Sequence, residues 1–126
     1  CKNCYVTLNA DAYGARAETI EARRRAILAY LAPRCSRCGF NEHASAMDLH
    51  HVEGEKESPV SDLITRVTLA PTAHNAGQLL REANKCVPLC ANCHRMLHAG
   101  VLTLRDDARP LRYTLVGLMD ALKGTG

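Results

Sequence analysis

The chain has 126 residues, enough for one domain with an added element, and its formal net charge of +3 is modest. With one phenylalanine, four tyrosines and no tryptophan, its core must be aliphatic, so bound metals or cross-links are expected to contribute to stability. The seven cysteines are an odd number, six of them stand in Cys-x-x-Cys pairs, and no apolar segment has the length of a signal peptide or a membrane span. These features argue against a secreted disulfide scaffold and a membrane protein, and they favour metal binding in a reducing cytoplasm.

Residues 1–33 are expected to contain part of a zinc knuckle followed by a basic helix. Cys1 and Cys4 have the spacing of one half of a knuckle, whose other half would precede the chain if it is a fragment or a processed product. The alternative is two ordinary thiols at a frayed terminus. Apolar residues recur at helical spacing over about residues 15–31, and Pro33 ends the predicted helix.

Arginines are concentrated in this first part of the chain. On the predicted helix, Arg23, Arg24 and Arg25 are expected to point largely away from an apolar stripe that includes Ile27 and Leu31. Such a cluster suits a nucleic-acid backbone, although many charge clusters are only solvated surface. The candidate nucleic-acid contacts are Arg23, Arg24, Arg25, Arg37 and Arg95.

Residues 34–104 are expected to form the central unit, which apolar patterning and cap residues divide into short elements. The predicted elements are a turn over residues 35–40, a strand over 46–52, a helix over 61–67 that Ser61 caps, a helix over 71–85, a small strand or knuckle arm over 86–90, a helix over 91–99 that Gly100 stops, and a short strand over 101–104. Residues 105–126 are expected to hold a C-terminal helix, over about 110–123, that packs against the rest of the chain or mediates contacts.

The central unit offers two kinds of metal ligand, sulfur and imidazole. If the residues after Cys90 form a helix, His94 and His98 lie one turn apart on one face, close enough to share a metal. One tetrahedral site could use three cysteines and either Cys93 or His94, but it could not also hold the remaining histidines, so two sites are the simpler interpretation. An all-sulfur set suits a structural zinc, and an imidazole set suits a catalytic cation with open positions and one histidine left as a base.

Together and in this order, these motifs closely resemble the HNH endonuclease family, and more narrowly its bacterial and phage members with a Cys4 zinc clamp. The resemblance covers about residues 35–100 and depends on two Cys pairs, a His-His pair at a strand end and a Cys-His-x-x-x-His helix. It implies an α+β fold with a ββα-metal core, in which two short antiparallel strands and a helix hold one divalent cation. A structural zinc and flanking N- and C-terminal helices would complete the molecule.

The resemblance also implies roles for individual residues. His50, His94 and His98 would bind the catalytic cation, which could be Mg²⁺, Mn²⁺, Ni²⁺ or Zn²⁺, and His51 would be the general base. The expected reaction is hydrolysis of double-stranded DNA that leaves 5′-phosphate and 3′-hydroxyl ends. The ligands of the structural zinc would be Cys35, Cys38, Cys90 and Cys93.

The sequence departs from the family pattern at the middle asparagine, which in the family steadies the loop that orients the base. An ungapped match places Lys85 at that position, with Asn84 beside it. Asn84 is therefore the candidate for orienting His51, and a backbone carbonyl is the alternative.

Other interpretations of the same residues stay open. A catalytically inactive zinc module could bind DNA or RNA through the arginine-rich helix, or the nuclease could need a partner protein or a second copy for targeting. The family implies the cytoplasm of a bacterium or of a phage-infected cell. His43 and His74 belong to no motif and are expected at the surface, whereas Cys86 is expected to be a buried thiol.

Overall fold

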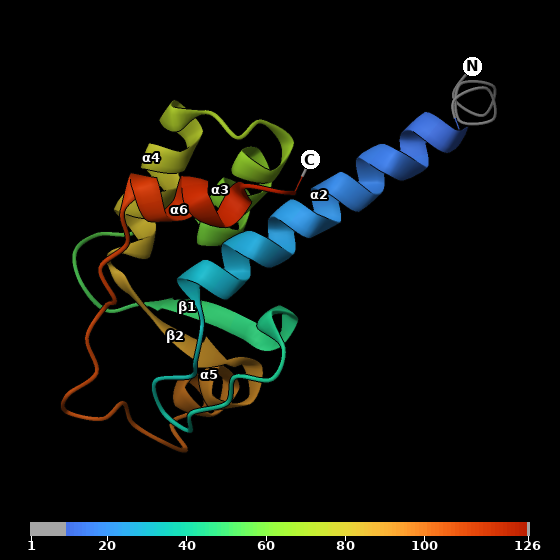
Figure 1. The fold of residues 1–126 in the computed structure, drawn as a ribbon. Helices are drawn as coiled ribbons and strands as arrows, with labels where there is room; N and C mark the ends of the chain where they lie inside the picture. Colours follow the sequence, from blue (N-terminus) through green and yellow to red (C-terminus); the bar gives the residue numbers. More distant parts are fainter. Residues whose placement is uncertain (1–9, 126) are drawn as a thin grey trace.

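The computed structural model describes residues 10–125, which form an α+β protein with helices packed against a two-stranded antiparallel sheet (Figure 1). The elements in chain order are α2 (Ala10–Leu31), the short 3-10 helix η1 (Ala44–Ala46), β1 (Met47–His51), α3 (Val60–Leu69), α4 (Ala73–Ala83), β2 (Cys86–Cys90), α5 (Ala91–His98) and α6 (Leu115–Leu122). Cys1 and Cys4, the predicted half of a zinc knuckle, lie outside the described residues. None of the helices within residues 10–125 has the length and apolar character needed to cross a membrane.

The sheet pairs β1 with β2, so that Met47 lies opposite Cys90 and His51 lies opposite Cys86. All five residues of β2 are buried, and α5 begins at the next residue and packs against both strands. Side chains alternate between the two faces of a strand, so Asp48 and His50 share one face of β1 and His51 lies on the other. The two neighbouring histidines therefore meet different parts of the molecule.

Buried side chains form two cores, and Leu49 of β1 packs against both of them. The larger core lies among α2, α3, α4 and α6 and includes the fully buried Ile27 and Leu79. The smaller core contains Val87 and Leu89 of β2 together with three buried cysteines. Because so few residues form the smaller core, its hydrophobic free energy is limited, and a metal bound there would add to it.

Most helix and strand bounds agree with the predictions from the sequence. β1 falls within the predicted strand, and Thr72 caps α4 by accepting a hydrogen bond from the backbone N–H of Asn75 at 3.1 Å. Gly100 follows α5 with a φ of 75°, a left-handed conformation that favours glycine and ends the helix. The predicted Ser61 cap is wrong, since α3 begins at Val60.

The strand predicted over residues 101–104 is wrong. The backbone N–H groups of Val101 and Leu102 donate to the carbonyl of Met96, so the chain turns back onto the end of α5 and has no strand partner within the described residues. The side chains of Leu102 and Leu104 pack on the smaller core. The apolar residues that suggested a strand thus belong to an irregular segment that packs on the smaller core.

The helix predicted over residues 110–123 begins only at Leu115. Thr114 caps it by accepting a hydrogen bond from the N–H of Gly117 at 3.0 Å. Just before the cap, the N–H of Tyr113 donates to the side-chain oxygen of Asn84 at 2.9 Å, which holds this segment extended against the end of α4. A contact with a residue distant in sequence therefore decides where α6 starts.

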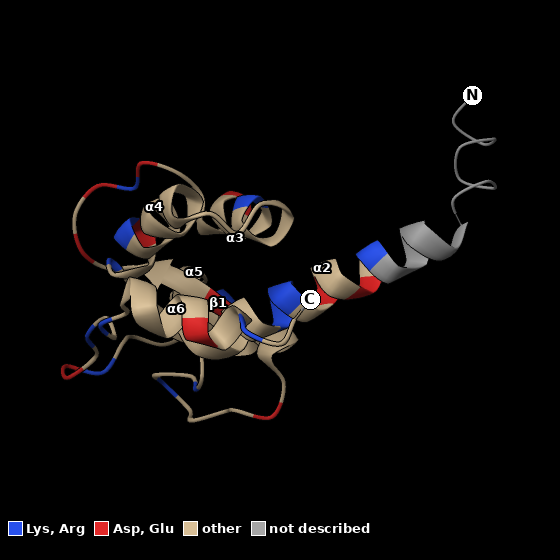
Figure 2. Cartoon of the chain, turned by 45° about the horizontal axis from the view of Figure 1, so that its top comes forward, with Lys and Arg blue, Asp and Glu red and all other residues tan. Residues whose placement is uncertain are grey.

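The orientation predicted for the arginines of α2 is wrong for Arg23 and Arg24. Arg23 donates to the carbonyl of Thr68 at 3.0 Å and Arg24 reaches the hydroxyl of Thr65 at 3.5 Å, so both lie against α3. Arg25 is exposed, as predicted. Figure 2 shows acidic as well as basic positions along α2, so the helix carries charges of both signs.

Candidate metal centres and active site

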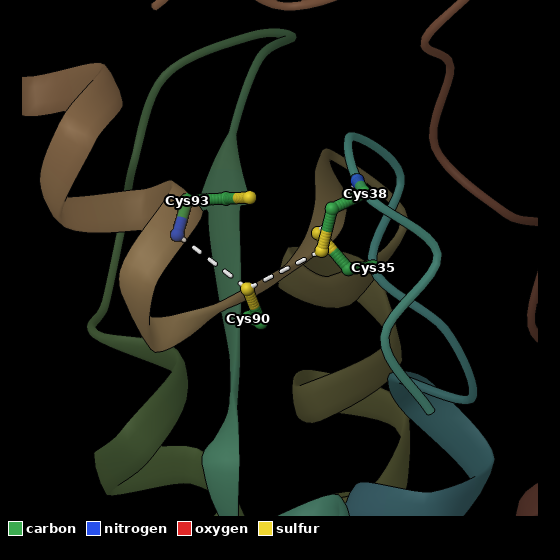
Figure 3. A group of neighbouring side chains, drawn as sticks. All are labelled: Cys35, Cys38, Cys90 and Cys93. Atoms are coloured by element: carbon green, nitrogen blue, oxygen red, sulfur yellow. Dashed lines mark hydrogen bonds between the residues drawn. The ribbon is translucent and has the colours of Figure 1, made fainter. Parts of the chain in front are cut away.

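The four paired cysteines of the central unit come together from two segments of the chain, as Figure 3 shows. Cys35 and Cys38 lie in the loop after α2, and Cys90 and Cys93 lie where β2 passes into α5. Their sulfur atoms all lie within 4.8 Å of one another, and the sulfurs of Cys38 and Cys90 are 3.7 Å apart. This arrangement could bind one metal ion such as zinc, with sulfur as the only ligand.

Backbone N–H groups approach the sulfur of the first cysteine of each pair. The N–H groups of Arg37 and Cys38 each approach the sulfur of Cys35 at 3.4 Å, and the N–H of Cys93 approaches the sulfur of Cys90 at the same distance. Burial alone raises the pKa of Cys35, but hydrogen bonds from backbone N–H groups outweigh it and lower the pKa to about 6. An ionised sulfur is the form that binds zinc.

The pKa of Cys93 shifts in the opposite direction, and this shift also fits a bound cation. Burial raises the pKa of Cys93 above its usual range, and the neighbouring sulfurs of Cys90, Cys38 and Cys35 raise it further. Four thiolates so close together repel one another unless a cation compensates their charge. The sequence left either Cys93 or His94 as the fourth ligand, and the structure places Cys93 among the sulfurs and His94 elsewhere.

Three imidazoles form a second cluster, which brings together the predicted ligands His50, His94 and His98. The ring centroid of His50 lies 5.3 Å from that of His94 and 5.4 Å from that of His98. The Nε2 atoms of His94 and His98 are 3.1 Å apart. Burial, and then the neighbouring imidazoles, lower the pKa of His50, so its ring is neutral at neutral pH and can donate a lone pair to a metal.

Asp48 is a member of this site that the motif analysis missed. Its carboxylate lies 3.0 Å from Nδ1 of His94, on the same face of β1 as His50. An ionised carboxylate only accepts hydrogen bonds, so Nδ1 carries the proton and the lone pair of His94 is on Nε2, which faces His98. A carboxylate that orients a histidine in this way is common at metal sites. The two-residue spacing from His50 could have revealed Asp48.

His51 lies outside the imidazole cluster and faces α4. Its Nε2 is 2.8 Å from a carboxylate oxygen of Glu82, whose side chain is only 3% exposed. The other oxygen of Glu82 lies 3.0 Å from the ammonium of Lys85. Burial by itself raises the pKa of Glu82, but the hydrogen bonds from His51 and Lys85 outweigh burial and the net shift is downward.

The prediction that Asn84 orients His51 is wrong. The Asn84 side chain accepts a hydrogen bond from the N–H of Tyr113 at 2.9 Å and donates to the carbonyl of the same residue at 3.3 Å. Both polar ends of the amide are thus used to hold the segment before α6. Glu82 is the side chain bound to His51, and its place one turn after Leu79 on the inward face of α4 was the signal that the sequence offered.

An open cavity of about 350 Å³ borders both histidine environments. His51 and His94 line it, as does Asp48, and its apolar wall comes mainly from α2, β1 and α3. The positively charged side chains of Arg24 and Lys56 also line it. A polyanion that entered the cavity would therefore meet two cations and the imidazole groups together.

The remaining candidate residues lie away from this cavity. Among the predicted nucleic-acid contacts, Arg23, Arg25, Arg37 and Arg95 do not line it, and Arg37 donates to the carbonyl of Thr103 at 3.2 Å. His43 and His74 are exposed and Cys86 is fully buried, as predicted. Burial raises the pKa of the Cys86 thiol to about 12. This cysteine is consequently a packing residue.

Comparisons with known proteins give one partial similarity. The chain is 31% identical over 74 residues to a protein of Schizosaccharomyces pombe (strain 972 / ATCC 24843) named "Uncharacterized 91 kDa protein in cob intron". The match covers 58% of this chain and 8% of that protein, so the chain spans a small part of its relative's length. No family model matches, and no solved structure matches.

Proposed function

We propose that this protein is a metal-dependent HNH endonuclease, with β1, β2 and α5 as its ββα-metal core. One observation carries the assignment. His50, His94 and His98 converge from a strand and a helix, while the adjacent His51 faces a buried carboxylate and lines a cavity that His94 also lines. A set of ligands and a separate, oriented base are what metal-assisted hydrolysis requires.

Different side chains would have different roles in the hydrolysis. The three imidazoles of the cluster would hold the cation, and Asp48 would keep His94 in the tautomer that presents Nε2. Once bound, a Mg²⁺, Mn²⁺, Ni²⁺ or Zn²⁺ ion would stabilise negative charge on the phosphate and on the departing 3′ oxygen. His51 would accept the proton of the attacking water, which leaves a 5′-phosphate and a 3′-hydroxyl end.

The four-cysteine cluster would bind a structural zinc that keeps the core assembled. Cys35 and Cys38 attach the loop after α2 to the junction of β2 and α5. His94 is the residue directly after Cys93, so an ordered sulfur cluster also fixes where the imidazole cluster begins. The zinc would thus act on the active site through geometry and take no part in the reaction.

The proposed substrate is double-stranded DNA. Arg24 and Lys56 place positive charge at the cavity beside His51, where they could contact phosphates on either side of the cleaved bond. Contacts of this kind position a duplex without reading its bases, so weak sequence selectivity is expected. The name of the similar Schizosaccharomyces pombe protein gives a location in an intron and no activity, so the side-chain geometry alone supports this substrate.

The test is nicking of supercoiled plasmid by the zinc-loaded protein with added Mg²⁺, Mn²⁺ or Ni²⁺. His51→Ala is expected to lower the nicking rate by about 100-fold or more, because a positioned base contributes about 10²–10⁴ to the rate. His98→Ala should raise the metal concentration needed for nicking. His74→Ala removes an exposed histidine outside the site and should nick like the wild type.

Absence of nicking with every metal, or equal nicking by wild type and His51→Ala, would show that the assignment is wrong. DNA or RNA binding without cleavage would instead favour the inactive zinc module. Nicking that appears only after a partner protein is added, or only in a dimer, would assign targeting to that partner or to the second copy.

A further inference from the structure

The contact between His51 and Glu82 is more constrained than a surface ion pair. The side chain of Glu82 is 3% exposed and that of His51 is 18% exposed, and their 2.8 Å contact lies between β1 and α4. The second oxygen of Glu82 receives the ammonium of Lys85 at 3.0 Å and lies 3.4 Å from the backbone N–H of Glu57. Both oxygens of this carboxylate therefore have a partner.

We propose that Glu82 is the positioning residue for His51 and that Lys85 holds the Glu82 carboxylate and the loop after β1 in place. The inference rests on the proposed nuclease function. It assigns to a glutamate and a lysine the task that the resemblance gave to an asparagine, which Asn84 does not perform because Tyr113 occupies its amide.

The contact decides which nitrogen of His51 acts. An ionised carboxylate has no hydrogen to donate, so Nε2 of His51 carries the hydrogen and Nδ1 carries the lone pair. No described residue is hydrogen bonded to Nδ1. Since His51 lines the cavity, Nδ1 is the atom left to receive a proton from water there.

Lys85 joins three parts of the surroundings of His51. Its backbone carbonyl accepts hydrogen bonds from the N–H groups of Val52 and Glu53, the two residues directly after His51, at 2.8 and 3.1 Å. Its ammonium donates to the carbonyl of Glu55 at 2.8 Å and to Glu82 at 3.0 Å. One residue therefore fixes both the chain that follows His51 and the carboxylate that orients its ring.

A buried carboxylate can also serve the fold alone, so the test must separate the two roles. Glu82→Gln keeps the shape of the side chain and an oxygen that can accept from Nε2, whereas Glu82→Ala removes the partner. If Glu82 positions His51, kcat should fall in the order wild type, Gln, Ala, by about 10- to 100-fold for Ala, with little change in KM. Lys85→Met should also lower kcat, although this variant keeps Glu82, because the carboxylate loses the ammonium that holds it.

The decisive comparison combines Glu82→Gln with His51→Ala. A positioning residue acts through the ring, so the Gln substitution should have no further effect on the residual rate once His51 is absent. Glu57→Gln is the matched control, because that carboxylate is 63% exposed and lies 4.0 Å from Lys85. Equal losses of kcat in the two backgrounds, or a Glu82→Ala variant with unchanged kcat, would overturn the proposal.

A second readout does not depend on cleavage. Long-range ¹H–¹⁵N NMR spectra of the zinc-loaded protein, at a pH where the ring is neutral, should show the Nε2–H tautomer for His51 in the wild type and a mixture of tautomers in Glu82→Ala. The same mixture in the wild type would contradict the inference. If the wild type has the expected tautomer and yet nicks no DNA, the nuclease proposal fails while the Glu82 contact stands.

Discussion

Two neighbouring histidines have different partners because they lie on opposite faces of one strand. His50 faces α5 and the two helix imidazoles, and His51 faces α4 and Glu82. Each histidine environment also contains one carboxylate, Asp48 of β1 in the imidazole cluster and Glu82 of α4 beside His51. At the scale of single residues, the proposed division between metal ligand and base would therefore follow from the two-residue period of a strand.

Asp48 gives a prediction that concerns metal binding only. Asp48→Asn replaces the carboxylate with an amide that no longer fixes the His94 tautomer, so the affinity of the imidazole cluster for Ni²⁺ or Mn²⁺ should fall about 10- to 100-fold. Isothermal titration calorimetry of the zinc-loaded protein measures this metal affinity. Asp62→Asn, an exposed aspartate in the first turn of α3, is the control, and equal affinities of the two variants would refute this role for Asp48.

At the scale of elements, the packing of α6 on α2 depends on a glycine. Gly117 faces the hydroxyl of Tyr30, and a methyl group at this position would overlap that hydroxyl. The same hydroxyl lies 3.0 Å from the N–H of Thr114, the residue that caps α6. The start and the contact face of α6 are thus both tied to one side chain of α2.

Gly117→Ala should destabilise the protein by about 1–3 kcal/mol, because an added methyl group must displace Tyr30. Gly77→Ala is the matched control, since Gly77 also lies in a helix and a methyl group there meets nothing within 4 Å. It should stabilise the protein by up to about 1 kcal/mol through the better helix propensity of alanine. Urea denaturation followed by circular dichroism gives both free energies of unfolding. A Gly117→Ala variant as stable as the wild type would show that α6 can shift without loss of stability.

At the scale of the whole molecule, two sites are built around one small sheet. The sulfur cluster lies in the smaller core, and Glu82 is held by a helix of the larger core. β1 connects them, because its residues contact both cores and carry Asp48, His50 and His51. Loss of either core should therefore disturb the proposed active site as well as the fold.

Removal of the proposed structural metal tests this dependence. Cys90→Ser should lose one zinc per chain and lower the melting temperature by more than about 10 °C, because metal binding and folding of a small core are coupled. Cys86→Ala, a buried cysteine outside the cluster, should keep the zinc content of the wild type. Mass spectrometry under native conditions and thermal melts measure both, and a Cys90→Ser variant with unchanged zinc content and melting temperature would rule out the sulfur site.

The sequence by itself determined the features that depend on short spacing. The strand that ends in His50 and His51, the helix that carries His94 and His98, and the cysteine pairs all follow from periods and turns within a few residues, where local geometry dominates. The two metal-ligand sets could be separated on the same basis. The nuclease assignment stays a prediction that cleavage assays must test.

Only the tertiary structure decided which residues support those groups. Glu82 and His51 are separated by 31 positions, and Asn84 and Tyr113 by 29, so no periodic pattern indicates either pair. The start of α6 and the orientation of Arg24 likewise depend on contacts between elements distant in sequence. Such pairs form when packing brings two elements together and buried polar groups must find partners, which is why the residue that orients His51 could not be identified from spacing alone.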